Sequence, residues 1–246
     1  MVKDIVIKLI DSKSARKIIS LYHYSGKSTQ NSQIHFGAFL NGQLEGCLQF
    51  GPSIDKRRMA QNLGIGINSF LELNRLAFSD RLPKNSESRS LGICLRLIKK
   101  QYPHIKLVIS FADACQCGDG IIYRASGFKL HSFKKNTSLL RMPNGDIVAK
   151  KSLDDSISLD GKYGSSLAIK NGAKPLSGYQ MKYLYFFDKE LEKKFKFIDF
   201  KDIPNNIKMY KGKKCASGVE SSMTSFQGVG DGESPIDALH LDRGDK

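Results

Sequence analysis

Long apolar runs are missing from this chain of 246 residues. A helix that spans a bilayer needs about 20 consecutive apolar residues, and no stretch approaches that length. A secretory signal peptide is also missing, because Met1 is followed by a short strand-like run that contains Lys3 and Asp4. We therefore expect no membrane span and a cytoplasmic location.

Cysteine is scarce as well. The five cysteines are odd in number and their spacing does not indicate a disulfide framework, which fits a reducing compartment. Cys115 and Cys117 form a C-x-C pair, but a zinc site needs a second pair of Cys or His residues, and none is near in the sequence. We interpret both as buried or incidental thiols, and the sequence leaves the metal content open.

Acidic residues are few relative to basic ones. The chain has 24 Asp and Glu against 39 Lys and Arg, which gives a net charge of +15 and a pI of about 9.6. From residue 216 onward there are six acids and two bases, so residues 1–215 hold 37 bases and 18 acids, a charge of +19. This favours a nucleic-acid partner. An anionic membrane surface and a basic surface that serves solubility are the alternatives.

The hydrophobic pattern predicts a sheet with helices on its faces. Strands are expected at residues 2–10, 34–40, 44–50, 70–78, 105–111, 128–142, 147–151 and 180–187. Helices are expected after Asp11, from Asn85 to about Lys100, and over 118–126. The order predicts an α+β fold with a mixed, mostly antiparallel sheet, as in GNAT acyltransferases. Residues 1–215 are expected to form one catalytic domain, and the Gly- and Ser-rich residues 216–246 a disordered tail.

Three polar clusters interrupt these elements. The first, Tyr22-His23-Tyr24, lies at the predicted end of the first helix. A His between two Tyr offers a proton shuttle, hydrogen-bond donors and metal ligands. A helix end packed by aromatics, with the His near the terminal carbonyls, is the alternative, and the sequence alone favours it.

The second cluster begins on a strand, where Glu72, Asn74 and Arg75 need partners or a cavity. Strict alternation places Glu72, Asn74 and Leu76 on one face. The cluster continues at the start of the next helix, where free N–H groups favour an anion and an Arg adds a bidentate donor. Ordinary helix capping with a surface ion pair is the alternative. The helix residues concerned are Ser86, Glu87, Ser88 and Arg89.

The third cluster follows a buried strand that contains Ser110 and ends near Asp113. Open α/β sheets place their sites at this end of a strand. Gly120 would let backbone approach a ligand, and Tyr123 on the next helix can point back toward Asp113. A carboxylate that only caps the helix is the alternative.

Two groups of basic residues are candidate contacts to a DNA backbone. They are Lys56, Arg57 and Arg58, and Lys134 and Lys135. Charge runs are commonly only solvated, so the sequence alone does not decide their role.

The same clusters carry a resemblance to the Mom family of bacteriophage DNA-modification proteins. The strings that carry it are E-L-N-R-L at 72–76, N-S-E-S-R at 85–89, S-F-A-D at 110–113, G-I-I-Y-R-A-S-G-F at 120–128 and H-Y at 23–24. The resemblance implies a GNAT-like fold that converts adenine in double-stranded DNA to N6-(carbamoylmethyl)adenine and so shields phage DNA from restriction. It also implies Asp113 and Tyr123 as catalytic residues with His23, Tyr24, Ser110 and 87–89 nearby, and an iron requirement that involves tyrosines.

One departure from GNAT enzymes concerns the group donor. Acetyl-CoA-dependent members carry a Q/R-x-x-G-x-G/A loop at the start of the helix after the fourth strand, whereas this chain reads P-K-N-S-E-S-R-S-L-G at 83–92. Acyl-CoA is therefore not expected, and the carbamoylmethyl group points to a glycine-derived donor. A non-catalytic DNA-binding protein, or an acyl-CoA-dependent acyltransferase with another substrate, are the alternative functions.

Overall fold

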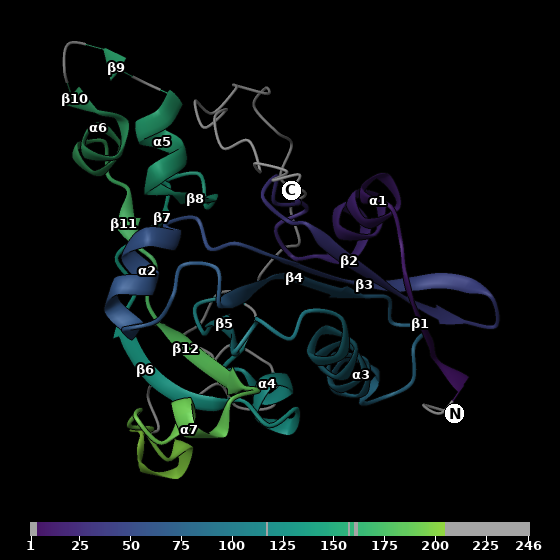
Figure 1. Ribbon diagram of the computed structural model, residues 1–246. Coiled ribbons are helices and arrows are strands. Elements are labelled where there is room, and N and C mark those ends of the chain that lie inside the picture. The colour runs from purple at the N-terminus through teal and green to yellow at the C-terminus, as the bar shows by residue number, and fades with distance from the viewer. Residues whose placement is uncertain (1–3, 117, 157, 160–161, 205–246) are drawn as a thin grey trace, which may run out of the picture. The chain divides into compact units, whose positions relative to one another are not determined.

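The computed structural model describes residues 4–116, 118–156, 158–159 and 162–204, and it divides the chain into two compact units (Figure 1). Within the described residues, the first unit comprises 4–137 and 176–204, and the second comprises 138–175. The second unit was not predicted from the sequence. The predicted tail at 216–246 lies outside the described residues and stays a prediction.

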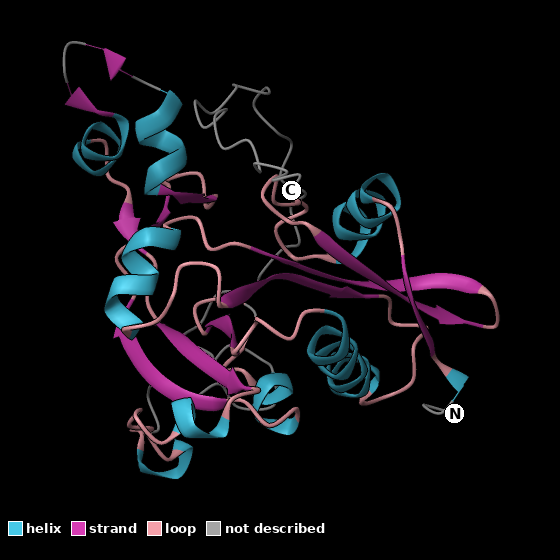
Figure 2. Cartoon of the chain, viewed as in Figure 1, coloured by secondary structure: helices cyan, strands magenta, loops and turns pink. Residues whose placement is uncertain are grey.

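The first unit is built on one seven-stranded sheet with the strand order β1-β2-β3-β4-β5-β12-β6. Among these strands β4 and β5 run parallel, and every other neighbouring pair is antiparallel. The predicted mixed, mostly antiparallel sheet flanked by helices is therefore confirmed (Figure 2). The strands are β1 (Val6–Leu9), β2 (Ile34–Leu40), β3 (Gln43–Gly51), β4 (Phe70–Phe78), β5 (Leu107–Asp113), β6 (Lys129–Lys135) and β12 (Tyr179–Phe186).

Five α-helices accompany this sheet in the described part of the unit: α1 (Ser12–Tyr22), α2 (Lys56–Leu63), α3 (Ser86–Gln101), α4 (Ile121–Ala125) and α7 (Lys189–Glu192). A 3-10 helix, η2 (Phe200–Asp202), follows α7. The α1 prediction is confirmed, because the Asp11 carboxylate accepts the Ser14 N–H at 2.9 Å. Helix α2 was not predicted. Asp55 caps its start, and Gly64, with φ 62°, ends it.

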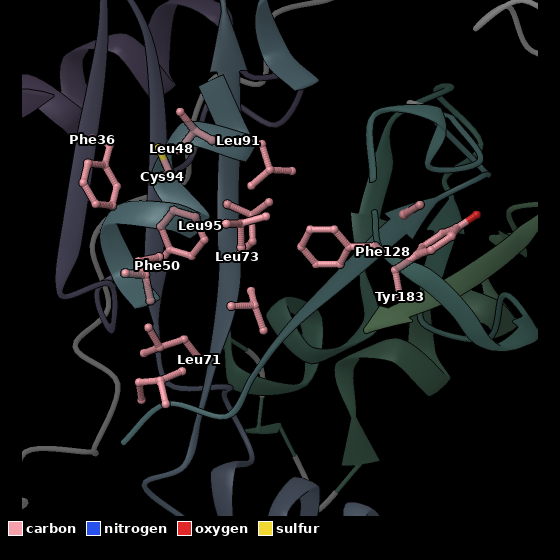
Figure 3. Packing of buried hydrophobic residues seen from close by; sticks show 14 of the residues in the cluster. Phe36, Leu48, Phe50, Leu71, Leu73, Leu91, Cys94, Leu95, Phe128 and Tyr183 are labelled. Atoms are coloured by element: carbon pink, nitrogen blue, oxygen red, sulfur yellow. The ribbon is translucent and has the colours of Figure 1, made fainter. Parts of the chain in front are cut away.

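The helices cover both faces of the sheet. On one face, the stripe Leu91, Cys94, Leu95 and Ile98 of α3 packs against the largest core cluster (Figure 3). That cluster includes Phe36, Leu48, Phe50, Leu71, Leu73, Val108, Phe128 and Tyr183. On the other face, α1 packs against β3 and β4, and α2 packs against β4, β5 and β12. Successive residues of a central strand therefore meet different helices, which matters for the site below.

The second unit is small. Its elements are β7 (Leu139–Arg141), β8 (Ile147–Ala149), α5 (Lys150–Ser156), β9 (Ser158–Leu159), β10 (Lys162–Tyr163), α6 (Gly164–Lys170) and β11 (Lys174–Pro175). Leu140, Ala168 and Ala173 form its core. The prediction of one strand over 128–142 is wrong. Asn136 interrupts it, because its buried amide donates to Leu176 O at 2.8 Å and its backbone N–H to Gly178 O at 2.9 Å.

Candidate active site

The parallel strands β4 and β5 separate in the middle of the sheet. Their hydrogen-bonded register joins Phe70–Glu72 to Leu107–Ile109 and ends there. Beyond this point β4 stays paired with β3, and β5 stays paired with β12. The polar clusters predicted from the sequence follow this separation on both strands.

Strand β4 carries a β-bulge at Asn74. Gln49 of β3 pairs with Arg75 and Phe50 pairs with Leu73, so Asn74 has no partner on β3. The extra residue reverses the alternation, and Leu76 packs in the same cluster as Leu73. The expectation that Glu72, Asn74 and Leu76 share one face is therefore wrong. The bulge instead places Arg75 on the face that Glu72 occupies.

Hydrogen bonds hold the bulge in place. The Asn74 amide oxygen accepts from Ser32 Oγ at 3.0 Å, and its nitrogen donates to Pro52 O and to Glu72 Oε1, both at 3.4 Å. Gly51 permits this approach, because a Cβ there would lie 2.4 Å from Asn31 O. The loop before β2 is therefore part of the support of β4, which the sequence did not indicate.

The position of Glu72 beside the bulge changes the acidity of its carboxyl group. Burial raises its pKa, and the nearby Ser53, Asn74 and Arg75 only partly oppose the shift. A carboxyl group with a raised pKa holds a proton more readily than an exposed one, which is the property of a general base near neutral pH.

Arg75 is the centre of the site. Its Nε donates to Lys27 O at 2.8 Å and its Nη1 to Asn74 O at 2.7 Å. Burial lowers its pKa, while Tyr24, Glu72 and Tyr123 raise it through their charges, and Arg75 in turn acts on His23. We call these five side chains, His23, Tyr24, Glu72, Arg75 and Tyr123, the Arg75 cluster. It joins the end of α1, strand β4 and helix α4, three segments far apart in the chain, and it contains members of all three polar clusters.

His23 is neutral in this cluster. Burial, and secondarily the charge of Arg75, lower its pKa to about 4. Its Nδ1 accepts the backbone N–H of Ser25 at 3.1 Å and lies 2.8 Å from Ser25 Oγ. Because a backbone N–H can only donate, Nδ1 carries a lone pair, and the proton of the neutral ring is on Nε2. The ring lies 4.4 Å from that of Tyr24.

Tyr123 links α4 to β5. Its hydroxyl donates to Phe111 O at 3.4 Å, just beyond the end of the β4–β5 register. Its ring packs against Phe128 and Tyr183 at centroid distances of 5.7 and 5.6 Å. The core thus fixes the ring while the hydroxyl stands at the point where the strands separate.

Asp113 and Gly120 both make structural contacts, and for Asp113 a capping role was the alternative that the sequence left open. The Asp113 carboxylate accepts the Cys115 N–H at 3.0 Å and the Gln116 amide at 2.9 Å, which are the bonds of a turn cap. At Gly120, φ is 84° and a Cβ would lie 2.4 Å from the Tyr183 ring. The expectation that Gly120 admits a ligand is corrected: Tyr183 occupies that space.

Comparison with known proteins identifies the family. The model of the Mom protein family matches residues 4–205. The chain belongs to the Mom protein family. Over 131 residues it is 37% identical to a protein named methylcarbamoylase mom from Escherichia phage Mu, which is 51% of this chain and 53% of the phage protein. The chain therefore spans about half the length of the curated relative that it matches.

Solved structures give more remote likenesses. An IAA acetyltransferase from Bacillus cereus is 12% identical with a TM-score of 0.44, and the match covers 74% of this chain and 99% of that one. A Bacillus subtilis acetyltransferase in complex with CoA is 10% identical with a TM-score of 0.43, and the match covers 74% of this chain and 99% of the Bacillus subtilis chain. A Drosophila melanogaster polyamine N-acetyltransferase is 11% identical with a TM-score of 0.44, and the match covers 75% of this chain and 100% of the Drosophila chain.

Hydrogen bonds within the chain and one acidic side chain surround the start of helix α3. Asn85, with φ 69°, precedes α3, and its side chain makes no capping bond. Ser86 Oγ donates to Pro83 O, and Ser88 Oγ donates to Asn85 O at 3.3 Å. Glu87 places a negative charge in the first turn, which opposes a pyrophosphate. Arg89 is exposed beside these side chains.

Two buried hydroxyls lie on the α3 side of the sheet. Ser110 on β5 and Ser90 on α3 are both 0% exposed, and neither hydroxyl has a hydrogen-bond partner among the described residues. Ser110 is the first β5 residue beyond the β4–β5 register and lies between the core residues Val108 and Ala112. Buried hydroxyls without protein partners are costly, and ordered water commonly supplies the missing hydrogen bond.

The residues of the Arg75 cluster do not fit a resident metal ion. In the described part of the chain, no group of three or more His, Cys, Asp or Glu side chains is placed to hold one. Nδ1 of His23 is engaged by Ser25, and the Arg75 guanidinium lies where it repels a cation. Cys117 lies outside the described residues.

The five basic residues that the sequence suggested as DNA-backbone contacts lie in different parts of the first unit. Lys56, Arg57 and Arg58 form the first turn of α2, where the helix dipole adds positive potential. Lys56 Nζ donates to Asn68 Oδ1 at 2.7 Å. Arg58 and Lys134 line one hollow, Arg57 lines another, and Lys135 is exposed at the end of β6. The sequence did not indicate that Arg58 and Lys134 would meet.

Sequence reasoning also missed the cluster that anchors α4. Arg124 forms an ion pair with Asp119 at 3.0 Å, donates to Tyr183 Oη at 2.8 Å and lies 3.4 Å from the centroid of the Phe200 ring. Tyr183 Oη donates to Asp119 O at 2.6 Å. Because Tyr183 comes from β12, the long-range contact had no local signal.

Among the described residues, no helix is long and apolar enough to cross a membrane.

Proposed function

We propose that this chain is a transferase that converts adenine in double-stranded DNA to N6-(carbamoylmethyl)adenine and thereby protects phage DNA from restriction in the host cytoplasm. The observation that carries the proposal is membership of the Mom family, together with 37% identity to a relative named methylcarbamoylase mom. The Arg75 cluster supports it, because it offers a base, two hydroxyls and fixed donors where two strands separate.

Glu72 is the proposed acceptor of the N6 proton. The exocyclic amine of adenine is a weak nucleophile, so its proton must leave as the new N–C bond forms. The raised pKa of Glu72 suits this role. We assign Asp113 to its turn, because its carboxylate is occupied by the N–H of Cys115 and the amide of Gln116.

His23 is proposed as a hydrogen-bond donor through Nε2–H. Its Nδ1 is held by Ser25, and at a pKa of about 4 the ring carries no charge near neutral pH. A neutral imidazole in this tautomer orients an acceptor and does not take a proton at Nε2. Tyr123 and Tyr24 supply further hydroxyls to the substrates.

The group donor is proposed to approach from the α3 side. There the hydroxyls of Ser90 and Ser110 lack partners within the described chain, and the start of α3 does not fit a CoA diphosphate. A glycine-derived molecule, which already contains the CH2–CO unit of the product, is smaller and needs no diphosphate site. As N6 bonds to its methylene carbon, the bond from that carbon to the donor's amino nitrogen breaks, and this nitrogen leaves with the proton that Glu72 takes from N6.

The DNA substrate accounts for the charge. Residues 1–215 carry +19, and such a surface binds phosphates with an affinity that falls steeply with salt. Because N6 lies inside the duplex stack, we propose that the enzyme extrudes the base before it reacts.

Mass spectrometry of nucleosides tests the proposal. Plasmid DNA from cells that express the protein should contain the carbamoylmethyl adduct, and Glu72→Gln should lower its amount by at least about 100-fold, the size of a general-base contribution. Glu190→Gln is the matched control, because Glu190 is exposed on α7 and pairs with Lys193. Folded wild-type protein that leaves all adenine unmodified contradicts the proposed function.

A further inference from the structure

A hollow of about 460 Å³ lies within the first unit, between helix α2 and the sheet. Its size falls in the range of small-molecule and nucleotide sites, roughly 300–1,000 Å³. The residues that matter here come from α2, β5, β6 and β12: Arg58, Asn62, Phe111, Lys134, Gln180 and Lys182.

Positive charge converges on this hollow. Arg58, Lys134 and Lys182 come from three different elements, and none of them forms an ion pair within the described chain. Lys182 is on a central strand, where burial and the charge of Lys134 lower its pKa. The one acidic lining residue, Asp55, accepts the backbone N–H of Arg58. Like charges held together without counterions favour an anionic ligand.

An exposed aromatic ring shares the hollow. Phe111 is 41% exposed, although Leu107 and Ile109 on the same face of β5 are fully buried. Cations beside an open aromatic face are the combination that proteins use for unstacked nucleotides, because the ring stacks on the base while the cations hold phosphates. The carboxamides of Asn62 and Gln180 are of the type that binds the edge of adenine.

The hollow adjoins the Arg75 cluster through one residue. Phe111 presents its ring to the hollow, while its carbonyl accepts the hydroxyl of Tyr123. Phe111 also lies directly after Ser110, just beyond the end of the β4–β5 register. A base stacked on Phe111 is therefore next to the side chains to which we assign the reaction.

We infer that this hollow receives the target nucleotide after its extrusion from the duplex, with the base on Phe111 and the flanking phosphates on Arg58, Lys134 and Lys182. The inference rests on the proposed function, because it takes DNA as the substrate. It assigns the α2 face to DNA and leaves the α3 face to the group donor.

Fluorescence anisotropy of a labelled DNA duplex, titrated at several salt concentrations, tests the inference. The affinity for DNA falls as salt rises, and each phosphate contact contributes about 0.9 to the steepness of log affinity against log salt. Arg58→Gln and Lys182→Gln should therefore each make this dependence shallower by about 0.9. Phe111→Leu should weaken single-stranded DNA binding roughly tenfold through lost stacking, with the slope unchanged. Arg96→Gln is the control, because Arg96 is exposed on α3, on the opposite face of the sheet.

Two results of the binding measurements overturn the inference. In one, Arg96→Gln lowers the slope as much as Arg58→Gln, so that only overall charge matters. In the other, folded hollow variants bind DNA like wild type but lose binding to acetyl-CoA, used as a diphosphate-bearing donor probe. The proposed function fails separately, when wild-type protein leaves no adduct in plasmid DNA. An adduct made equally well by wild type and by all hollow variants refutes the inference alone.

Discussion

Protonation of His23 should cost the folded protein stability in a defined pH range. The ring has an ordinary pKa of 6.5 when unfolded and about 4 in the folded site. Above pH 6.5 it is neutral in both states and makes no difference. As the pH falls from 6.5 toward 4, the His23 ring binds a proton in the unfolded chain but stays neutral in the folded chain, so the free energy of unfolding decreases.

The size of the effect follows from the shift. Each pKa unit corresponds to about 1.36 kcal/mol, so the change from 6.5 to about 4 amounts to roughly 3 kcal/mol when complete. Between pH 7 and pH 4.5 the protein should lose roughly 2.5 kcal/mol through this residue. His23→Gln should lack this part of the pH dependence. His35, whose pKa is also lowered, contributes equally to both proteins and cancels in the comparison.

Urea denaturation at pH 7 and pH 4.5, for wild type and His23→Gln, measures the difference. NMR titration of the ring protons measures the pKa itself, and His23→Gln identifies the signal among the five histidines. Arg75→Gln should raise the pKa only partly, because burial is the larger cause and Arg75 the smaller. A His23 signal that titrates near 6.5 in wild type refutes the burial argument. A full return to 6.5 in Arg75→Gln refutes the order of causes.

Three further predictions concern the elements around the site. Gly120→Ala should destabilise the protein by roughly 2–5 kcal/mol in urea denaturation, since it combines a left-handed backbone with a clash against Tyr183. Gly64→Ala, left-handed but in open space, should cost only about 1 kcal/mol, and equal costs for the two contradict the packing argument. Arg124→Met should cost on the order of 3 kcal/mol, because it removes the guanidinium that pairs with the buried Asp119 carboxylate, and Asp119→Asn added to it should recover part of the loss. Asp113→Asn should keep the DNA adduct while Asp113→Ala loses about 1 kcal/mol of stability; loss of the adduct in a stable Asp113→Asn protein would return Asp113 to the reaction.

Local signals predicted most of the sheet. Strands β2 and β4 have the predicted bounds, and the Asn41-Gly42 turn has both residues at positive φ, as a two-residue hairpin requires. Helix α2 escaped prediction because Lys, Arg and Gln dominate its eight residues, so its apolar stripe is short. The second unit was not predicted because its helices and strands are short. In addition, its strand β7 continues the hydrophobic pattern of β6 past Asn136.

The Arg75 cluster could be predicted as a set of residues but not as an arrangement. His23, Glu72 and Tyr123 stood out as polar side chains in otherwise ordinary elements. The β-bulge at Asn74 decides which face Arg75 takes, and it depends on a loop some 40 residues earlier in the chain, at Ser32. The sequence does carry a signal for the hollow: Gln180 and Lys182 alternate with buried residues on a central strand, where polar side chains need a cavity.

Strand β5 shows why the two substrates belong on opposite faces. Ser110 points to the α3 side, where its hydroxyl lacks a partner in the described chain, and Phe111 opens to the hollow under α2. Displacement at a methylene carbon needs the nucleophile and the leaving group on opposite sides of that carbon. Consecutive residues of one strand meet this requirement, because they face opposite sides of the sheet where β4 no longer covers β5. Under the proposed function, the donor and the adenine are therefore expected to approach β5 from opposite faces, beyond the end of its pairing with β4.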